Sequence, residues 1–238
     1  MVLDEVDSTM AEAARRAPDL TAPTWIMARA QTAARGRRGR AWFNPAGNFA
    51  ATLVLRPKGS AGDAALRSFV TSIALYQTLA MTVASDRLSL KWPNDVLLDG
   101  GKVAGILLES SGQGPRVDWL AIGIGVNLAA APPATQVEAD ALRPVSVARN
   151  GTKAPSQDDF LFWLASHYAD LERQLSEFGF DPIRRLWLRH AARLGEVIRA
   201  RTAREEFHGT FADVDKDGQL VLETAKGRIT IPAADVYF

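Results

Sequence analysis

The chain has 238 residues, a net charge of +1 at pH 7 and no cysteine, with 47% hydrophobic and 23% charged residues. These values are typical of a globular protein, and they exclude disulfides, thiolate metal sites and a cysteine nucleophile. A general nucleic-acid binder would carry a broader excess of Lys and Arg. The start, MVLDEVDSTM, lacks the basic region of a signal peptide, and no apolar run could span a bilayer. We therefore expect a soluble, cytoplasmic protein without membrane contacts.

The first 194 residues alternate between helical and strand patterns. Thr9 and Glu12 have capping-box spacing ahead of an alanine-rich helix that ends near Ala17. Asp99-Gly100-Gly101 predicts a tight hairpin turn. The remaining predicted elements are strands at 25–30, 49–55, 88–92, 96–98, 103–109 and 119–128, and helices over 63–84, 156–179 and 182–194.

After Gly195 the pattern changes to short strands at 197–200, 207–214, 220–223 and 229–231, with glycine-containing turns between them. Such a series is typical of a small β-barrel of SH3-like size. We therefore predict an α+β protein with two parts. Residues 1–194 form a mixed β-sheet flanked by helices, and residues 195–238 form a small C-terminal SH3-like β-barrel.

The segment between the first two predicted strands, here called the arginine loop, reads QTAARGRRGRAWFN over residues 31–44. Arginine forks pair with phosphate or carboxylate oxygens, and glycines let backbone N–H groups approach a ligand closely. Trp42 could stack on a purine base, although a lone tryptophan is more often a core or rim residue. The pattern fits a loop that folds over an anionic ligand. A solvated basic turn or a nucleic-acid patch has the same composition.

The segment LKWPNDV gathers a lysine, an amide and a carboxylate at a strand end. Pro93 disfavours a central strand position and predicts a bend that aims Asn94 and Asp95 into a site. Asp95 could there support Mg²⁺, which takes one or two carboxylates together with phosphate oxygens. An Asx turn, in which Asn94 and Asp95 bond only their own backbone, explains the spacing equally well.

Lys102 opens the otherwise apolar strand GKVAGILLE. If this lysine faces the same cleft, its charge needs an anionic partner such as a ligand carboxylate. A hairpin lysine with its head in water is the alternative. Downstream, Gly123-Ile124-Gly125 is a lone GxG and is too short to indicate a nucleotide fold.

Together these stretches resemble the biotin–protein ligases. Members of that family carry a Gly-Arg-Gly-Arg-Arg-Gly-Arg loop with a following aromatic residue, then Lys-Trp-Pro-Asn-Asp, Gly-Lys-x-x-Gly-Ile-Leu-x-Glu and Gly-x-Gly-x-Asn. The corresponding segments are 34–40 with Trp42, 91–95, 101–109 and 123–127. Some members add an N-terminal DNA-binding domain. This chain starts at the catalytic segment, so we expect the monofunctional type without a repressor role.

Two positions depart from the family pattern. The usual Ser-Thr-Asn reads Ser8-Thr9-Met10, so a polar contact near biotin is missing or replaced. The first glycine of the arginine loop is Ala34, which narrows the backbone freedom at that point. Neither departure removes a charged group.

The resemblance implies a two-step ligase. Its substrates are ATP and biotin, Mg²⁺ accompanies ATP, and no cofactor is permanently bound. Biotin and ATP give biotinyl-AMP and diphosphate, and the acyl group then passes to a lysine of a biotin carboxyl carrier protein. The implied catalytic residues are Arg37, Lys91, Asp95 and Lys102. The implied biotin-binding residues are Ser8, Thr9, Met10, Gln31, Arg35, Gly36, Arg37, Lys102 and Gly105. The implied ATP-binding or adenylate-binding residues are Arg37, Arg40, Trp42, Lys91, Asn94 and Asn127, and Asp95 is the implied metal-supporting residue.

Three other functions are compatible with parts of the sequence. A lipoate–protein ligase shares the expected fold and adenylate chemistry, although its usual glycine-rich motif is missing. A nucleic-acid-binding module would need a basic surface beyond one loop, and the net charge of +1 argues against it. A catalytically inactive biotin-binding relative is disfavoured because Lys91, Asp95 and Lys102 are all present. The sequence leaves the carrier protein, and the choice between monomer and homodimer, open.

Overall fold

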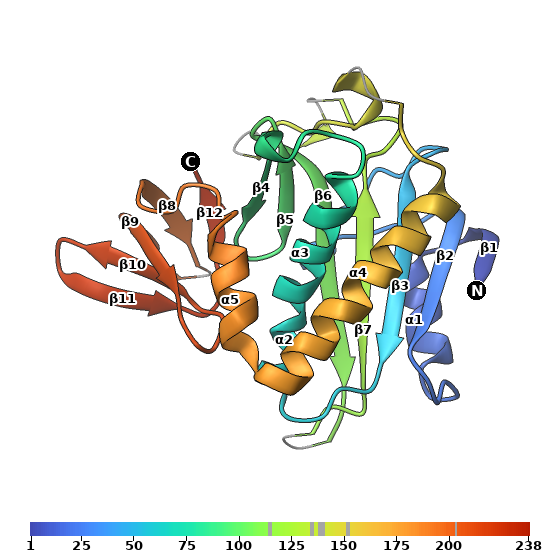
Figure 1. Cartoon of the computed structure of the whole chain (residues 1–238), viewed down its shortest axis with the longest axis horizontal. Coiled ribbons are helices and arrows are strands. Elements are labelled where there is room, and N and C mark those ends of the chain that lie inside the picture. Colours follow the sequence, from blue (N-terminus) through green and yellow to red (C-terminus); the bar gives the residue numbers. More distant parts are fainter. Residues whose placement is uncertain (114–115, 134–135, 138–140, 151–152, 203) are drawn as a thin grey trace.

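A computed structural model describes residues 1–113, 116–133, 136–137, 141–150, 153–202 and 204–238. Its centre is a seven-stranded sheet with the order β1-β2-β3-β7-β6-β5-β4 (Figure 1). The strands are β1 (Val2–Val6), β2 (Thr24–Gln31), β3 (Phe49–Leu55), β4 (Leu88–Lys91), β5 (Asp95–Leu98), β6 (Gly101–Ser111) and β7 (Trp119–Val126). β1 pairs with β2 in parallel and the other neighbours are antiparallel, which confirms the predicted mixed sheet.

Helices cover the two faces of this sheet unequally. The α-helices are α1 (Thr9–Arg16), α2 (Ala61–Ala65), α3 (Arg67–Leu79), α4 (Gln157–Phe178) and α5 (Phe180–Leu188), and the short 3₁₀ turns are Arg37–Gly39, Ser85–Arg87 and Ala148–Asn150. α3, α4 and α5 lie in front of the sheet in Figure 1, and the main core forms between them and the strands. Behind the sheet, α1 packs through Met10 and Ala13 against Ile26 and Val54 in a second, smaller core.

The C-terminal strands form a separate five-stranded antiparallel sheet with the order β11-β10-β9-β8-β12, at the left of Figure 1. They are β8 (Val197–Arg201), β9 (Glu206–Val214), β10 (Leu220–Thr224), β11 (Gly227–Ile231) and β12 (Asp235–Tyr237). This sheet is consistent with the predicted SH3-like barrel, although no pairing in the described strands closes it. Trp92 Nε1 donates to Gly218 O at 3.0 Å and so ties the two sheets together.

Two predicted helices differ from the observed ones. The helix expected over 63–84 is divided at Leu66 into α2 and α3 and ends at Leu79. The helix expected over 182–194 ends at Leu188, because the following backbone pairs with β4: Leu90 N donates to His190 O, and Ala192 N donates to Leu90 O, both at 2.8 Å. Strands β1 and β12 were not predicted at all.

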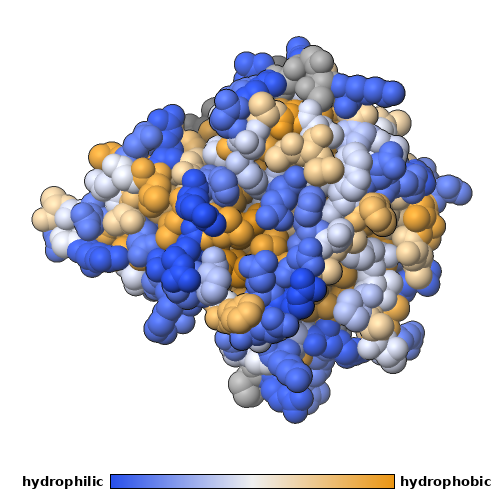
Figure 2. All heavy atoms as spheres, in the orientation of Figure 1, coloured by the Kyte–Doolittle hydropathy of each residue, from blue (hydrophilic) through white to orange (hydrophobic). Residues whose placement is uncertain are grey.

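Figure 2 shows charged and polar residues over much of the face that carries α4, with apolar residues between them. No helix in the described ranges is both long and apolar enough to cross a membrane.

A partly buried ion pair links α3 to α4. The Arg67 side chain is 9% exposed, and its Nη2 and Nε lie 2.6 and 3.0 Å from Glu172 Oε1. Tyr168 OH donates to the other oxygen of Glu172 at 3.1 Å. Glu172 therefore satisfies two buried donors that the core could not otherwise accommodate.

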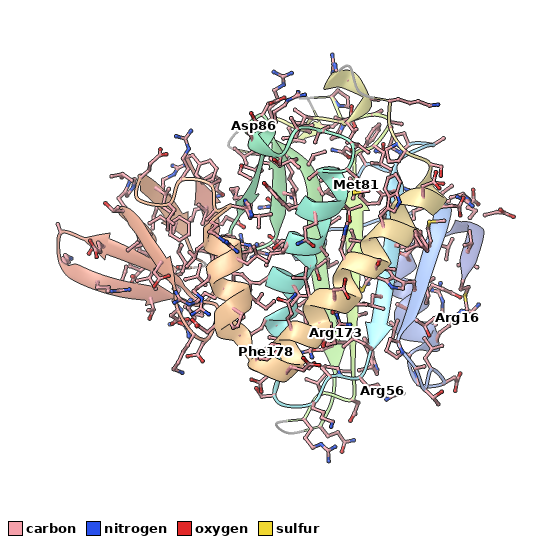
Figure 3. The ribbon with its side chains drawn as sticks, in the orientation of Figure 1. Arg16, Arg56, Met81, Asp86, Arg173 and Phe178 are labelled. Atoms are coloured by element: carbon pink, nitrogen blue, oxygen red, sulfur yellow. The ribbon has the colours of Figure 1, made fainter. Side chains whose placement is uncertain are left out.

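We expect Glu172→Ala to lower the free energy of unfolding by about 2 kcal/mol, because it leaves the buried Arg67 charge without its carboxylate. Urea unfolding at pH 7 measures this change. The matched control is Arg173→Ala on the solvent side of α4 (Figure 3), where the pair with Asp170 is 61% and 58% exposed. That control should change the free energy by less than about 0.5 kcal/mol. Equal effects of the two substitutions would contradict a structural role for Glu172.

Candidate active site

A cavity of about 1190 Å³ opens on the sheet face opposite α3 and α4. It is bounded by the arginine loop, the start of α1, the turn between β4 and β5, strands β6 and β7, and the end of β12. The residues that the sequence predicted to bind or react all line it: Ser8, Thr9, Met10, Gln31, Arg35, Gly36, Arg37, Arg40, Trp42, Lys91, Asn94, Asp95, Lys102, Gly105 and Asn127. The fold therefore brings every predicted site residue to one place.

Glycines on the central strands make the floor of this cavity. Gly105 on β6 and Gly125 on β7 are paired across the sheet. A Cβ built on Gly125 would lie 2.4 Å from Trp42 Cε2, and one on Gly105 would lie 3.2 Å from Trp42 Cζ3. The indole of Trp42 thus rests on bare backbone that any larger residue would displace. The GxG pattern of β7 is too short to indicate a fold by itself, but in the structure its glycines leave the cavity floor without side chains.

The arginine loop is folded as a small hairpin over the cavity. Gly36 N donates to Arg40 O at 2.7 Å, and Trp42 N donates to Ala34 O at 2.9 Å. The tip requires left-handed backbone at Arg38 and Gly39, with φ of 57° and 72°. Glycine adopts this conformation without a steric penalty, so Gly39 makes the reversal feasible.

A carboxylate from the C-terminal sheet meets this hairpin. Asp235 on β12 has a side chain only 13% exposed, and its carboxylate lies 2.5 Å from Arg38, 3.5 Å from Arg40 and 4.0 Å from Arg37. Sequence reasoning missed Asp235, because it lies about two hundred residues downstream in a strand that the pattern did not reveal. The alternation of polar and apolar residues at Asp235, Val236 and Tyr237 is a strand pattern, and it is the signal by which the sequence could have revealed this strand.

A second carboxylate lies among the lysines. Lys102 Nζ is 2.7 Å from Asp95 Oδ1, and Lys91 Nζ is 3.9 Å from Asp95 Oδ2. Burial alone would raise the pKa of Asp95, but the charges of Lys102, Lys91 and Arg37 outweigh it, so the pKa is lowered. Burial lowers the pKa of Lys91, against the attraction of Asp95. Asp95 is therefore an ionised, enclosed carboxylate that holds two lysines at the cavity wall.

Arg37 and Asn94 connect the arginine loop to the sheet. Asn94 Nδ2 donates to Ile106 O at 2.5 Å, and Ile106 N donates back to Asn94 O at 3.0 Å, which fixes the amide beside β6. Its Oδ1 accepts a hydrogen bond from Arg37 Nη1 at 3.3 Å. Burial lowers the pKa of Arg37, opposed by Asp235 and Asp95. Arg37 thus presents a partly desolvated guanidinium at the junction of loop, sheet and cavity.

The start of α1 forms the other end of the cavity. Ser8 Oγ accepts from Ala11 N at 3.0 Å and caps the helix. Thr9 N donates to Gln31 Oε1 at 2.7 Å, and the Thr9 hydroxyl accepts from Thr52 Oγ1 at 2.9 Å. The polar groups here are held in place by the fold before any ligand arrives.

Asn127 is positioned from behind by a residue that the sequence did not single out. Asn127 Nδ2 donates to Val145 O at 3.1 Å, and its Oδ1 accepts from Asn48 Nδ2 at 3.4 Å. Asn48 is fully buried and also accepts from the N–H groups of Ala129 and Ala130. The pair fixes the loop after β7 where it borders the cavity.

The electrostatics of the lining are strongly one-sided. Its described cations are Arg35, Arg37, Arg40, Lys91, Lys102, Arg143 and Arg199, and its described carboxylates are Asp95 and Asp235. No cluster of three His, Asp or Glu side chains suited to a metal occurs in the described part of the chain. Such a cavity favours an elongated anion with an apolar portion, and a phosphate ester or anhydride of a carboxylic acid meets that description.

Known proteins match both sheets. Residues 2–127 match the model of the biotin/lipoate A/B protein ligase family, and residues 194–238 match the biotin protein ligase C terminal domain. The chain is 55% identical to a biotin–[acetyl-CoA-carboxylase] ligase of Paracoccus denitrificans, over 100% of this chain and 99% of that one. It is 30% identical to the bifunctional ligase/repressor BirA of Bacillus subtilis, over 99% and 73% of the two chains.

A solved structure has the same fold. The biotin protein ligase of Aquifex aeolicus in complex with biotin and ATP superposes with a TM-score of 0.83 at 24% identity, covering 99% of this chain and 96% of that one. From the family match over residues 2–127 and the full-length relative, the chain belongs to the biotin/lipoate A/B protein ligase family, among its biotin–protein ligases.

Proposed function

We propose that this chain is an ATP-dependent ligase that activates biotin as biotinyl-5′-AMP and transfers it to a lysine of a biotin carboxyl carrier protein domain. The observation that carries the proposal is the cavity: the predicted biotin-binding and ATP-binding residues line one space with a strong excess of positive charge. Biotin carries a carboxylate and ATP carries a polyphosphate, so the first step must join two anions that repel each other. Positive side chains fixed around both anions reduce this repulsion.

In the first step, an oxygen of the biotin carboxylate attacks the α-phosphorus of ATP. A new O–P bond forms, and the bond from the α-phosphorus to the oxygen that bridges to the β-phosphate breaks, so that diphosphate leaves with the electron pair. Lys102 would bind the carboxylate and the α-phosphate, because its side chain is 31% exposed and lines the cavity beside Asp95. Arg37, Arg40 and Lys91 would bind phosphate oxygens. Trp42 would cover the adenine side, with the amides of Asn94 and Asn127 serving the nucleotide.

At the other end, Ser8, Thr9, Met10, Gln31, Arg35, Gly36 and Gly105 would enclose biotin. The hydrogen-bonded set of Thr9, Gln31 and Thr52 supports this assignment, because it offers fixed polar atoms to the polar ureido ring of biotin. Closure of the arginine loop over the product would keep water from the mixed anhydride, which water would otherwise hydrolyse.

In the second step, the neutral amine of the carrier lysine attacks the acyl carbon, AMP leaves with the electrons of the broken C–O bond, and the attacking nitrogen loses a proton to give the neutral amide. Asp95 is the proposed acceptor of that proton or the group that orients the amine. Its ionised state in a buried position supports this role.

Asp95 is also the proposed protein support for the Mg²⁺ that accompanies ATP. Magnesium sites next to phosphates need only one or two protein carboxylates, and Asp95 is an ionised carboxylate on the cavity wall, so the donor set fits. Bound there, the ion would neutralise phosphate charge.

The remaining parts of the proposal concern location and assembly. The Paracoccus denitrificans relative is named for acetyl-CoA carboxylase, and we propose a carboxylase carrier domain as the partner here too. The division into a catalytic part, 1–194, and a C-terminal part, 195–238, stays a prediction, as does a cytoplasmic location without nucleic-acid binding. Monomer and homodimer are both compatible with the chain.

The direct test mixes the protein with biotin, Mg-ATP and a biotin carrier domain, and measures the mass of the carrier. We expect the added mass of one biotinyl group, dependent on ATP, and no addition when the carrier lysine is replaced by arginine. Lipoic acid in place of biotin should give little or no product. An unmodified carrier under all conditions would overturn the proposal, and preferential lipoylation would replace it with the lipoate–protein ligase.

We expect Lys102→Met to slow biotinyl-AMP formation by about 10²–10³-fold, the usual cost of losing one group that stabilises transition-state charge. The free energy of unfolding should fall by no more than about 2 kcal/mol, because Lys91 still faces Asp95. Diphosphate release and urea unfolding measure the two effects. Lys216→Met is the matched control, since Lys216 also pairs with an aspartate but is 88% exposed. If the loss in free energy of unfolding is as large as the rise in activation free energy that the slower reaction implies, Lys102 has a structural role.

Asp95 generates a prediction about pH. Its pKa is lowered in the folded protein, so the carboxylate adds stability above its unfolded value of 3.8, and this contribution is lost as the pH falls through the folded pKa. We expect Asp95→Asn to be less stable than the wild type at pH 7, with a difference that shrinks steadily below about pH 4. Urea unfolding between pH 7 and 3 measures it. Asp4→Asn, at an exposed position, should show no such trend. A difference independent of pH would exclude a charge effect.

A further inference from the structure

Met10 lies directly on the floor of the cavity at the end formed by α1. A Cβ built on Gly123 would lie 2.7 Å from Met10 Cε and 3.7 Å from Thr52 Oγ1. Met10 lines the cavity, yet only 4% of it is exposed. The methionine tip therefore occupies the space that a side chain on Gly123 would otherwise take.

The surroundings of Met10 are polar on one side and apolar on the other. Thr9 is the preceding residue, and its hydroxyl and N–H are held by Thr52 and Gln31. On the other side, Met10 belongs to the small core with Ala13 and Ala121, which anchors its stem. A ligand that reaches this end meets fixed polar atoms beside one apolar, close-packed tip.

Gly123 and Gly125 are two residues apart on the same face of β7, so their positions are separated by about 7 Å. Met10 lies on the first glycine and Trp42 lies on the second. The two large side chains thus cover adjacent places on the floor, and Met10 is the one at the end formed by α1. A methionine tip can shift a little, but its stem is anchored in the small core, so the tip limits the space beside Gly123 that a ligand ring can enter.

We propose that Met10, seated on Gly123, is the specificity-determining residue for the ring-bearing end of the acid substrate. It sets the depth of the pocket, so that the ring system of biotin is accepted and the same ring with an added substituent is refused. This inference rests on the proposed biotin ligase function and adds to it the limit on which biotin-like acids the chain activates.

The first test measures kcat/KM for adenylate formation with four acids. These are biotin, two ring-substituted analogues (biotin sulfone and a ureido N-methyl biotin), and homobiotin, which lengthens only the acid chain. In Met10→Ala, the kcat/KM of at least one ring-substituted analogue relative to that of biotin should rise tenfold or more. The corresponding ratio for homobiotin should stay within threefold of the wild type. Met10→Leu, of similar volume, should keep all ratios within threefold. Unchanged ring-analogue ratios in Met10→Ala, or an equal rise for homobiotin, would overturn the proposal.

The second test asks whether residues 10 and 123 share one space. Gly123→Ala alone should weaken biotin binding at least tenfold, because its Cβ displaces the Met10 tip. In the Met10→Ala background the same substitution should cost threefold or less. Calorimetric titration with biotin gives both numbers, and thermal unfolding verifies that each variant is folded. An equal cost in both backgrounds would contradict the shared space.

These outcomes separate the inference from the function beneath it. A wild-type protein that forms no biotinyl-AMP fails the proposed function itself. A wild-type protein that does so, with ring selectivity unchanged in Met10→Ala, fails only the assignment to Met10.

Discussion

The concentration of positive charge around one cavity is the constraint on which the site depends. Like charges at such short range repel, and burial lowers the pKa of Arg37 and Lys91 further. The fold answers with two internal counter-ions from different sheets. Asp95 on β5 holds the lysines, and Asp235 on β12 holds the arginines. A substrate with a carboxylate and phosphates can pair with the same lysines and arginines, so their mutual repulsion favours the binding of such a substrate.

Space for that substrate comes from the unequal covering of the central sheet. α3 and α4 bury one face and supply most of the core, so the opposite face can remain bare without loss of the main packing. Glycines on β6 and β7 keep it bare, and Trp42 and Met10 each lie on one of these glycines. Successive residues of a strand point to opposite faces of the sheet. In β6 and β7, one set of alternate residues therefore packs in the core, and the other set lines the cavity.

Local patterns predicted β2 to β7 of the central sheet but missed β1, because apolar runs bounded by turn residues depend on neighbours in sequence and the short edge strand β1 has no such run. The Asp99-Gly100 turn was readable for that reason, with φ of 50° and 73°. Long-range effects were not readable. The helix near 182 ends early because its continuation pairs with β4, and Asp235 reaches the arginine loop only through the docking of the second sheet. Gly123 and Gly125 belong to a segment that matched a family motif, but their place beneath Met10 and Trp42 was not readable, since it depends on which side chains lie across the sheet.

The position of Asp235 gives the C-terminal sheet a part in binding as well as in packing. The sheet shares the main core with the rest of the molecule, and Trp92 at Gly218 and Asp235 at the arginine hairpin add polar contacts between them. If an anion displaces Asp235 from these arginines, then by linkage the docked sheet weakens the binding of that anion to the same extent. The arginine loop and the second sheet are therefore electrostatically coupled, because Asp235 on β12 pairs with Arg38 and Arg40.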